Sequence, residues 1–130
     1  MHIDHINISA PMELLEKVKE FYCQVFDLKE GFRPDFSNRG YWLYADDKPI
    51  VHLSESDLHK PMAKQGYLDH VAFQASGLNE VISRLESLNH KYRMDYIPDI
   101  HLTQIFLNDP AGSRLEINFP DRAIRNGGQL

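Results

Sequence analysis

The pattern of apolar and polar residues in the first half of the chain predicts one helix among four short strands. Residues 3–8 alternate between the two kinds, as is typical of a strand, and this places His5 and Asn7 on one face. Residues 11–27 carry apolar side chains at three-and-four spacing after an opening proline, which predicts a helix with one core-facing side. Further strands are predicted at residues 28–33, 41–45 and 49–54.

The second half of the chain repeats this order. A strand is predicted at residues 68–73 and a helix at 78–89. The helix again has a core-facing apolar stripe at three-and-four spacing, formed by Leu78, Val81, Ile82, Leu85 and Leu88. Three strands then follow at residues 92–97, 102–108 and 114–119, with a turn over Asp109-Pro110-Ala111-Gly112 between the last two. The order β-α-β-β-β therefore occurs twice.

The repeat is also visible in individual residues. Ile3-Asp4-His5-Ile6 reappears as Leu68-Asp69-His70-Val71, and Val51-His52-Leu53 corresponds to Leu115-Glu116-Ile117. We therefore predict an α+β fold of two βαβββ modules, residues 1–56 and 67–119, paired about a pseudo-two-fold axis around a cleft lined by curved mixed sheets. The modules would form a single domain over residues 1–119, followed by a polar tail at 120–130.

Four residues of the repeat are candidate metal ligands: His5, His52, His70 and Glu116. Their sequence neighbours are mostly apolar, so strand alternation turns the neighbours to the helix side and these four side chains to the other face. Any one of them alone is better explained as an ordinary polar residue on a sheet. Together they form a set of imidazole and carboxylate donors that suits one divalent ion of Zn, Ni, Mn, Fe or Co.

Other residues on the predicted inner face are candidates for substrate binding. Asn7, Gln74 and Asn118 share that face by strand parity, and each is equally compatible with an ordinary wet sheet surface. Phe106 is a candidate wall of an apolar pocket around the metal, and His101 begins a strand beside the predicted cleft.

Composition excludes several classes of partner. The net charge is −5 and no basic stripe is present, so we expect no nucleic-acid partner. No apolar run is long enough to span a membrane, and the start of the chain is unlike a signal peptide, which predicts a cytoplasmic protein. Two modules of this kind leave sheet edges open, and we therefore expect a homodimer.

With these features in view, the chain resembles the vicinal oxygen chelate superfamily, which groups glyoxalase I, methylmalonyl-CoA epimerase, extradiol dioxygenases, fosfomycin-resistance enzymes and bleomycin-binding proteins. The resemblance rests on residues 3–6, the stretch 68–73 and, most specifically, the stretch Phe106-Leu107-Asn108-Asp109-Pro110-Ala111-Gly112-Ser113-Arg114-Leu115-Glu116. It covers nearly all of residues 1–119.

The resemblance implies a metal-dependent enzyme acting on a small oxygen-bearing substrate, as a lyase, isomerase, thiol transferase or dioxygenase. In the family, residues matching His5, His70 and Glu116 bind the metal, and the position matching His52 varies between branches. Glyoxalase I usually has a carboxylate there, and extradiol dioxygenases usually have a tyrosine matching Phe106, so the chain departs from both branches. His52 is then either a fourth ligand or a catalytic base. The alternative is a non-catalytic protein that binds an antibiotic or toxin.

Overall fold

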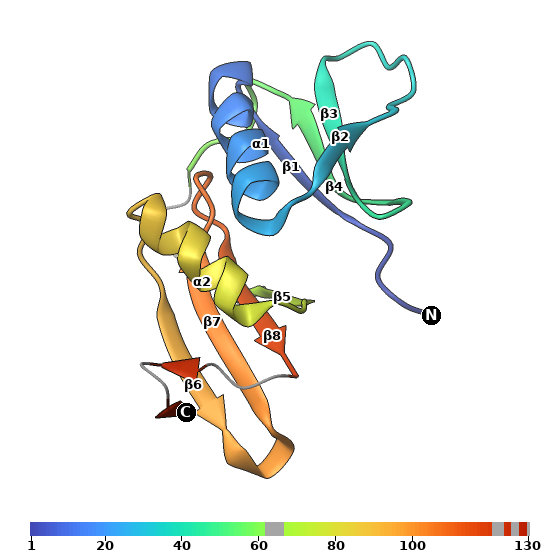
Figure 1. Cartoon of the computed structure of the whole chain (residues 1–130). Coiled ribbons are helices and arrows are strands. Elements are labelled where there is room, and N and C mark those ends of the chain that lie inside the picture. Colours follow the sequence, from blue (N-terminus) through green and yellow to red (C-terminus); the bar gives the residue numbers. More distant parts are fainter. Residues whose placement is uncertain (62–66, 121–123, 126–127, 130) are drawn as a thin grey trace. The chain divides into compact units, whose positions relative to one another are not determined.

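The computed structural model describes residues 1–61, 67–120, 124–125 and 128–129, and it divides into two units, Met1–Ala63 and Lys64–Leu130. The first unit, in blue to green in Figure 1, has five elements in chain order. They are β1 (Ile6–Ala10), α1 (Met12–Phe26), β2 (Lys29–Gly31), β3 (Gly40–Ala45) and β4 (Lys48–Glu55). The sheet order is β1-β4-β3-β2, with β1 parallel to β4 and the other pairs antiparallel.

The second unit repeats this arrangement. Its elements are β5 (Val71–Gln74), α2 (Leu78–Ser87), β6 (Arg93–Ile97), a single 3-10 turn η1 (Pro98–Ile100), β7 (Leu102–Asn108) and β8 (Arg114–Phe119). The sheet order is β5-β8-β7-β6, again with a parallel pair between the first and last strands. The prediction of an α+β fold with two βαβββ units is confirmed. In the predicted tail, β9 (Ile124–Arg125) pairs with β10 (Gly128–Gln129).

The helix of the first unit supplies half of that unit's core. Its buried side chains are Leu15, Val18, Phe21, Tyr22 and Val25, and they pack on the sheet face that carries the buried residues Leu43, Val51 and Leu53. Burying one such side chain stabilises the fold by about 1.5–3 kcal/mol. The helix ends where predicted, because Asp27 adopts a left-handed backbone with φ of 58° and its N–H bonds to the Tyr22 carbonyl.

The helix of the second unit is shorter than predicted. It buries Leu78, Val81 and Leu85, but it ends at Ser87 and leaves Leu88 46% exposed, so the prediction that Leu88 faces the core was wrong. The reason is local: Asn89 has a φ of 53°, which takes the backbone out of the helical path. No helix among the described residues is long and apolar enough to cross a membrane.

The first strand of each unit also starts later than predicted. β1 begins at Ile6 and β5 at Val71, so His5 and His70 each lie immediately before a strand instead of within it. In the second unit the register would place His70 opposite Arg114, the first residue of β8, so the residues before His70 have no partner in that strand. In the other case, the β4 segment that would pair with residues before His5 contains Pro49, which has no N–H to donate.

The turn before β8 is held by one buried carboxylate. Asp109 is 4% exposed, and its Oδ1 accepts hydrogen bonds of 2.9 Å from the N–H groups of Ala111 and Ser113. Gly112 completes the turn with a φ of 87°, a conformation that favours glycine. The turn fixes where β8 starts and therefore where Glu116 stands on the sheet.

Candidate metal and substrate site

The polar face of the first unit carries three of the predicted site residues. Asn7 of β1, His52 of β4 and Trp42 of β3 form one cross-strand row, and His5 precedes Asn7 on the same face. The alternate residues of these strands, such as Leu43 and Val51, point to the helix. The predicted parity of Asn7 and His52 therefore agrees with the register of the sheet, and His5, which lies before β1, is placed on this face by its ring contact with His52.

His52 lies in the middle of a stack of three rings. Its ring centroid is 3.7 Å from that of His5, with 10° between the planes, and 4.1 Å from that of Trp42, with 14° between the planes. His52 is 9% exposed, and its Nε2 lies 3.0 Å from the Pro49 carbonyl oxygen, which can only accept a hydrogen bond. Nε2 is thus assigned the proton, and Nδ1 is the ring nitrogen with a lone pair. Burial lowers the pKa of His52, and the neighbouring His5 lowers it further.

The stacking limits what His5 and His52 can do together. An ion bound to an imidazole nitrogen lies close to the plane of that ring, at about 2.0–2.1 Å. The planes of two nearly parallel rings with centroids 3.7 Å apart do not meet within bonding distance of the ring nitrogens. As these rings lie, His5 and His52 do not bind the same ion.

His5 is oriented by the residue that precedes it. The His5 Nδ1 lies 2.7 Å from Asp4 Oδ2, and this hydrogen bond is the main cause that lowers the pKa of Asp4. Nδ1 donates to the carboxylate, so the Nε2 lone pair is left for a metal ion. Carboxylate-histidine pairs of this kind are the usual outer partners of metal-bound imidazoles.

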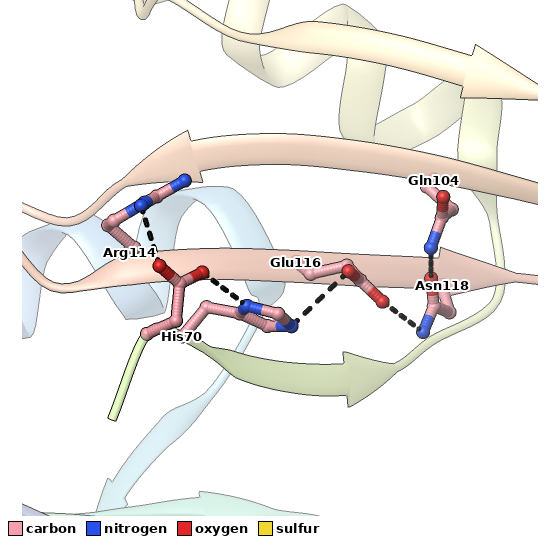
Figure 2. A network of polar contacts seen from close by, with 6 residues as sticks. His70, Gln104, Arg114, Glu116 and Asn118 are labelled. Carbon is pink, nitrogen blue, oxygen red and sulfur yellow. Dashed lines mark hydrogen bonds and ion pairs between the residues drawn. The ribbon is translucent and has the colours of Figure 1, made fainter. Parts of the chain in front are cut away.

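The second unit contains the same pair in the same place. The His70 Nδ1 lies 2.8 Å from Asp69 Oδ2, and the other oxygen of Asp69, Oδ1, accepts a 2.9 Å hydrogen bond from Arg114 Nη1. Figure 2 shows this chain of contacts continuing from the far side of the imidazole, where His70 Nε2 lies 3.5 Å from Glu116 Oε1. The hydrogen bond from His70, with Arg114 adding to it, lowers the pKa of Asp69.

The second carboxylate oxygen of Glu116, Oε2, forms the hydrogen bond that orients this side chain. Glu116 Oε2 accepts a 2.9 Å hydrogen bond from Asn118 Nδ2, and Asn118 Oδ1 in turn accepts a 3.1 Å bond from Gln104 Nε2 (Figure 2). The Glu116 side chain is 15% exposed, compared with 43% for His70. Two amides on neighbouring strands thus hold the carboxylate with one oxygen toward the imidazole.

The His70–Glu116 pair fits a divalent ion in both chemistry and spacing. Two ligand atoms about 2.1 Å from one ion are separated by roughly 3.0–3.5 Å in octahedral or tetrahedral geometry. The 3.5 Å between Nε2 and Oε1 is at the upper end of that range. Among the residues that the structure describes, no group of three His, Cys, Asp or Glu side chains gathers into a metal site. A complete site therefore needs donors beyond this pair.

The remaining predicted residues differ in their relation to this pair. Phe106 is directly opposite Glu116 in the register, and Gln74 is opposite Asn118, so both share its polar face. His101, by contrast, caps η1 and precedes β7, five residues from Phe106, which corresponds to about 16 Å along a strand. Its Nδ1 lies 3.4 Å from the Tyr96 hydroxyl. The structure does not bring His101 to the His70–Glu116 pair.

Sequence reasoning missed the residues that orient the candidate ligands. Asp4 and Asp69 hold the two imidazoles, Gln104 supports Asn118, and Trp42 stacks on His52. A signal for the first two was present, because the Asp-His dipeptide occurs at equivalent places in both halves of the repeat. For Gln104 and Trp42 the signal exists only in the register of the sheets.

Comparison with known proteins gives a consistent result. Residues 2–117 match the family model described as Glyoxalase/Bleomycin resistance protein/Dioxygenase superfamily. A glyoxalase family protein from Bacillus anthracis is 22% identical, with a TM-score of 0.71 over 92% of this chain and 94% of that one. No curated protein matches the sequence.

Two further solved structures share the fold. Lactoylglutathione lyase from Agrobacterium tumefaciens is 19% identical, with a TM-score of 0.63 over 91% of this chain and 92% of that one. The fosfomycin resistance protein FosX from Listeria monocytogenes, in complex with Mn(II) and sulfate, is 18% identical, with a TM-score of 0.63 over 91% of both chains.

Proposed function

The chain belongs to the Glyoxalase/Bleomycin resistance protein/Dioxygenase superfamily, and on that premise we propose that it is a divalent-metal-dependent enzyme acting on a small oxygen-bearing substrate. Its ligands would be His5, His70 and Glu116. The superfamily contains a FosX protein that was solved with Mn(II), which supports a divalent ion in this fold. The bound ion would act as a Lewis acid toward one or two oxygens of the substrate.

The observation that carries this proposal is the repeated Asp-His pair. In both units an aspartate accepts a hydrogen bond from Nδ1 of a histidine, at 2.7 Å for His5 and 2.8 Å for His70, which leaves Nε2 as the lone-pair nitrogen. In the second unit that nitrogen already faces a carboxylate oxygen at 3.5 Å. A pair of imidazoles prepared in the same way at equivalent positions of a repeat is better explained by metal binding than by solvent exposure.

His52 has a different proposed role. Because its ring stacks on His5 and its Nε2 donates to Pro49, we assign it as the catalytic group that accepts a proton at Nδ1. Burial lowers its pKa, so the ring is in the neutral, proton-accepting form at neutral pH. Asn7, Gln74, Phe106 and Asn118 are proposed to contact substrate. His101 is left out because it precedes β7 and lies five residues from Phe106.

Elemental analysis of the purified protein tests the proposal. We expect one divalent ion per chain, lost on His5→Ala, His70→Ala or Glu116→Ala. The matched controls are His2→Ala and Glu20→Ala, which remove the same groups from exposed positions. Absence of stoichiometric metal after incubation with Zn, Ni, Mn, Fe and Co in turn would contradict metal dependence and favour the alternative, a small-molecule binding protein without chemistry.

Substrate trials follow with the metal that is found. The first reactions to try are those named for proteins with this fold, a lactoylglutathione lyase and the fosfomycin resistance proteins. Activity that disappears with His52→Ala while metal content stays at one ion per chain would support the role assigned to His52. Loss of metal in that variant would contradict a purely catalytic role for His52.

A further inference from the structure

The second unit contains an open cavity of about 700 Å³ beside the candidate ligand pair. Phe106, Leu107 and Leu115 give it an apolar wall, and His70 lines it as well. Among the described residues that line it, three are permanent cations, Lys91, Arg93 and Arg114, and one is a carboxylate, Asp69. The protein as a whole has a net charge of −5, so this concentration of positive charge is local.

The three cations differ in the hydrogen bonds and ion pairs that they already form. Arg114 bonds to Asp69 through Nη1, and Arg93 bonds to Asp95 through Nη1. A guanidinium has five N–H donors, so each arginine retains donors for another acceptor. Lys91 is exposed and forms no ion pair within the part of the chain that the structure describes.

Arg93 is also held by an aromatic ring. Its guanidinium carbon lies 4.3 Å from the centroid of Phe106, so the group rests over the ring while Asp95 holds one of its nitrogens. An arginine restrained in this way loses little side-chain entropy when it binds an anion. This favours a built anion site over a set of freely moving surface cations.

The sheet register places this charge at a fixed distance from Glu116. Arg93, Phe106 and Glu116 are successive partners across β6, β7 and β8. Neighbouring strands are about 4.8 Å apart, so the backbone of Arg93 is roughly 10 Å from that of Glu116. Phe106 lies between the two.

We infer that this cavity binds the oxyanion group, a carboxylate or a phosphate, of a small substrate whose other end reaches His70 and Glu116. The anion contacts Lys91 and Arg93, and the middle of the molecule passes over the apolar wall at Phe106. The position of the second end rests on the proposed function. The anion site itself depends only on residues of the second unit.

The test is a titration of the full-length, metal-free protein with sodium phosphate or sodium acetate at constant ionic strength, followed by backbone NMR. We expect saturable shifts around residues 89–93 and 106–108. Lys91→Ala and Arg93→Ala should each weaken binding roughly three- to tenfold, and Lys91→Arg should restore it. Lys17→Ala, which removes an exposed cation from α1, is the charge-matched control. Tighter binding of phosphate than acetate assigns the group as a phosphate, and the reverse order assigns it as a carboxylate.

The inference is overturned if neither anion gives saturable shifts, or if Lys17→Ala weakens binding as much as Lys91→Ala. Metal content measured on the same samples separates this outcome from failure of the proposed function. Metal-binding protein without an anion site would leave the proposed function standing and remove this inference. Anion binding at Lys91 in a protein that takes up no metal would leave the anion site standing and contradict the proposed function.

Discussion

Replacing Asp69 with asparagine should weaken metal binding more than the same change at Asp4. Asp69 is held from both sides, by His70 at 2.8 Å and by Arg114 at 2.9 Å, and its side chain is 53% exposed. Asp4 is 87% exposed, and among the described residues its one side-chain hydrogen bond is to His5. The carboxylate that is itself anchored restrains its imidazole more strongly, because less orientational freedom remains in the pair.

The size of the effect follows from the role of such outer partners. Their removal typically costs 10–100-fold in metal affinity. We expect Asp69→Asn to fall within that range and Asp4→Asn to cost less than about tenfold. Competition with a chromophoric chelator measures both affinities, and Asp35→Asn, at an exposed loop position, is the control.

A second measurement separates orientation of the ring from loss of folding. In the metal-free protein, nitrogen NMR of His70 should report the Nδ1–H tautomer, and Asp69→Asn should shift it toward a mixture of tautomers. Equal losses of affinity at Asp4 and Asp69, or an unchanged tautomer in Asp69→Asn, would refute the argument that an anchored carboxylate fixes the imidazole.

Three further predictions concern folding, acid and assembly. Asp109→Ala should lower the free energy of unfolding by about 2–3 kcal/mol in a urea titration, because two N–H groups of the turn lose their charged acceptor. A change below about 0.5 kcal/mol would show that the turn is held by other contacts. Burial depresses the folded-state pKa of His52, so the stability from its neutral ring should be complete above about pH 6.5 and lost as pH falls from there toward the folded pKa. His52→Gln in chelator-treated protein should therefore flatten the loss of stability between pH 7 and pH 5, and an unchanged slope would assign that loss to other groups. Light scattering should give the mass of a homodimer, and a monomer at high micromolar concentration would contradict the prediction.

The sequence predicted the elements well because each unit has a simple two-sided pattern. Alternation along β7 and β8 reports which side chains are buried, and the Asp-His dipeptide at equivalent places marks the correspondence between the halves. Strand ends were less predictable, because the extent of β1 and β5 depends on their pairing with β4 and β8, which lie far along the chain. The end of α2 depended on the left-handed backbone of Asn89, which apolar spacing does not report.

The arrangement of the site residues was harder to predict for a related reason. Strand parity correctly placed His52 on the polar face, but the stack with Trp42 depends on the pairing of β3 with β4 and on the rotamers of both rings. The hydrogen bonds of Asn118 to Glu116 and Gln104 likewise arise across neighbouring strands. These side-chain contacts between strands depend on the pairing register. The register is determined by all strands of the sheet together, so the pattern of one strand does not predict it.

The division of each sheet into a helix side and a polar side also bears on how the proposed experiments can be interpreted. The buried residues that stabilise the second unit, such as Leu85, Ile105 and Ile117, lie on the helix side. His70 and Glu116 lie on the other side, and the imidazole is 43% exposed. Removing either group therefore leaves the apolar core intact, so the cost in stability should stay below that of a core truncation, which is about 2–5 kcal/mol. If Glu116→Ala loses its metal but keeps a cooperative unfolding transition, the variant has lost a ligand. A core truncation that loses both the metal and the cooperative transition would report only on folding.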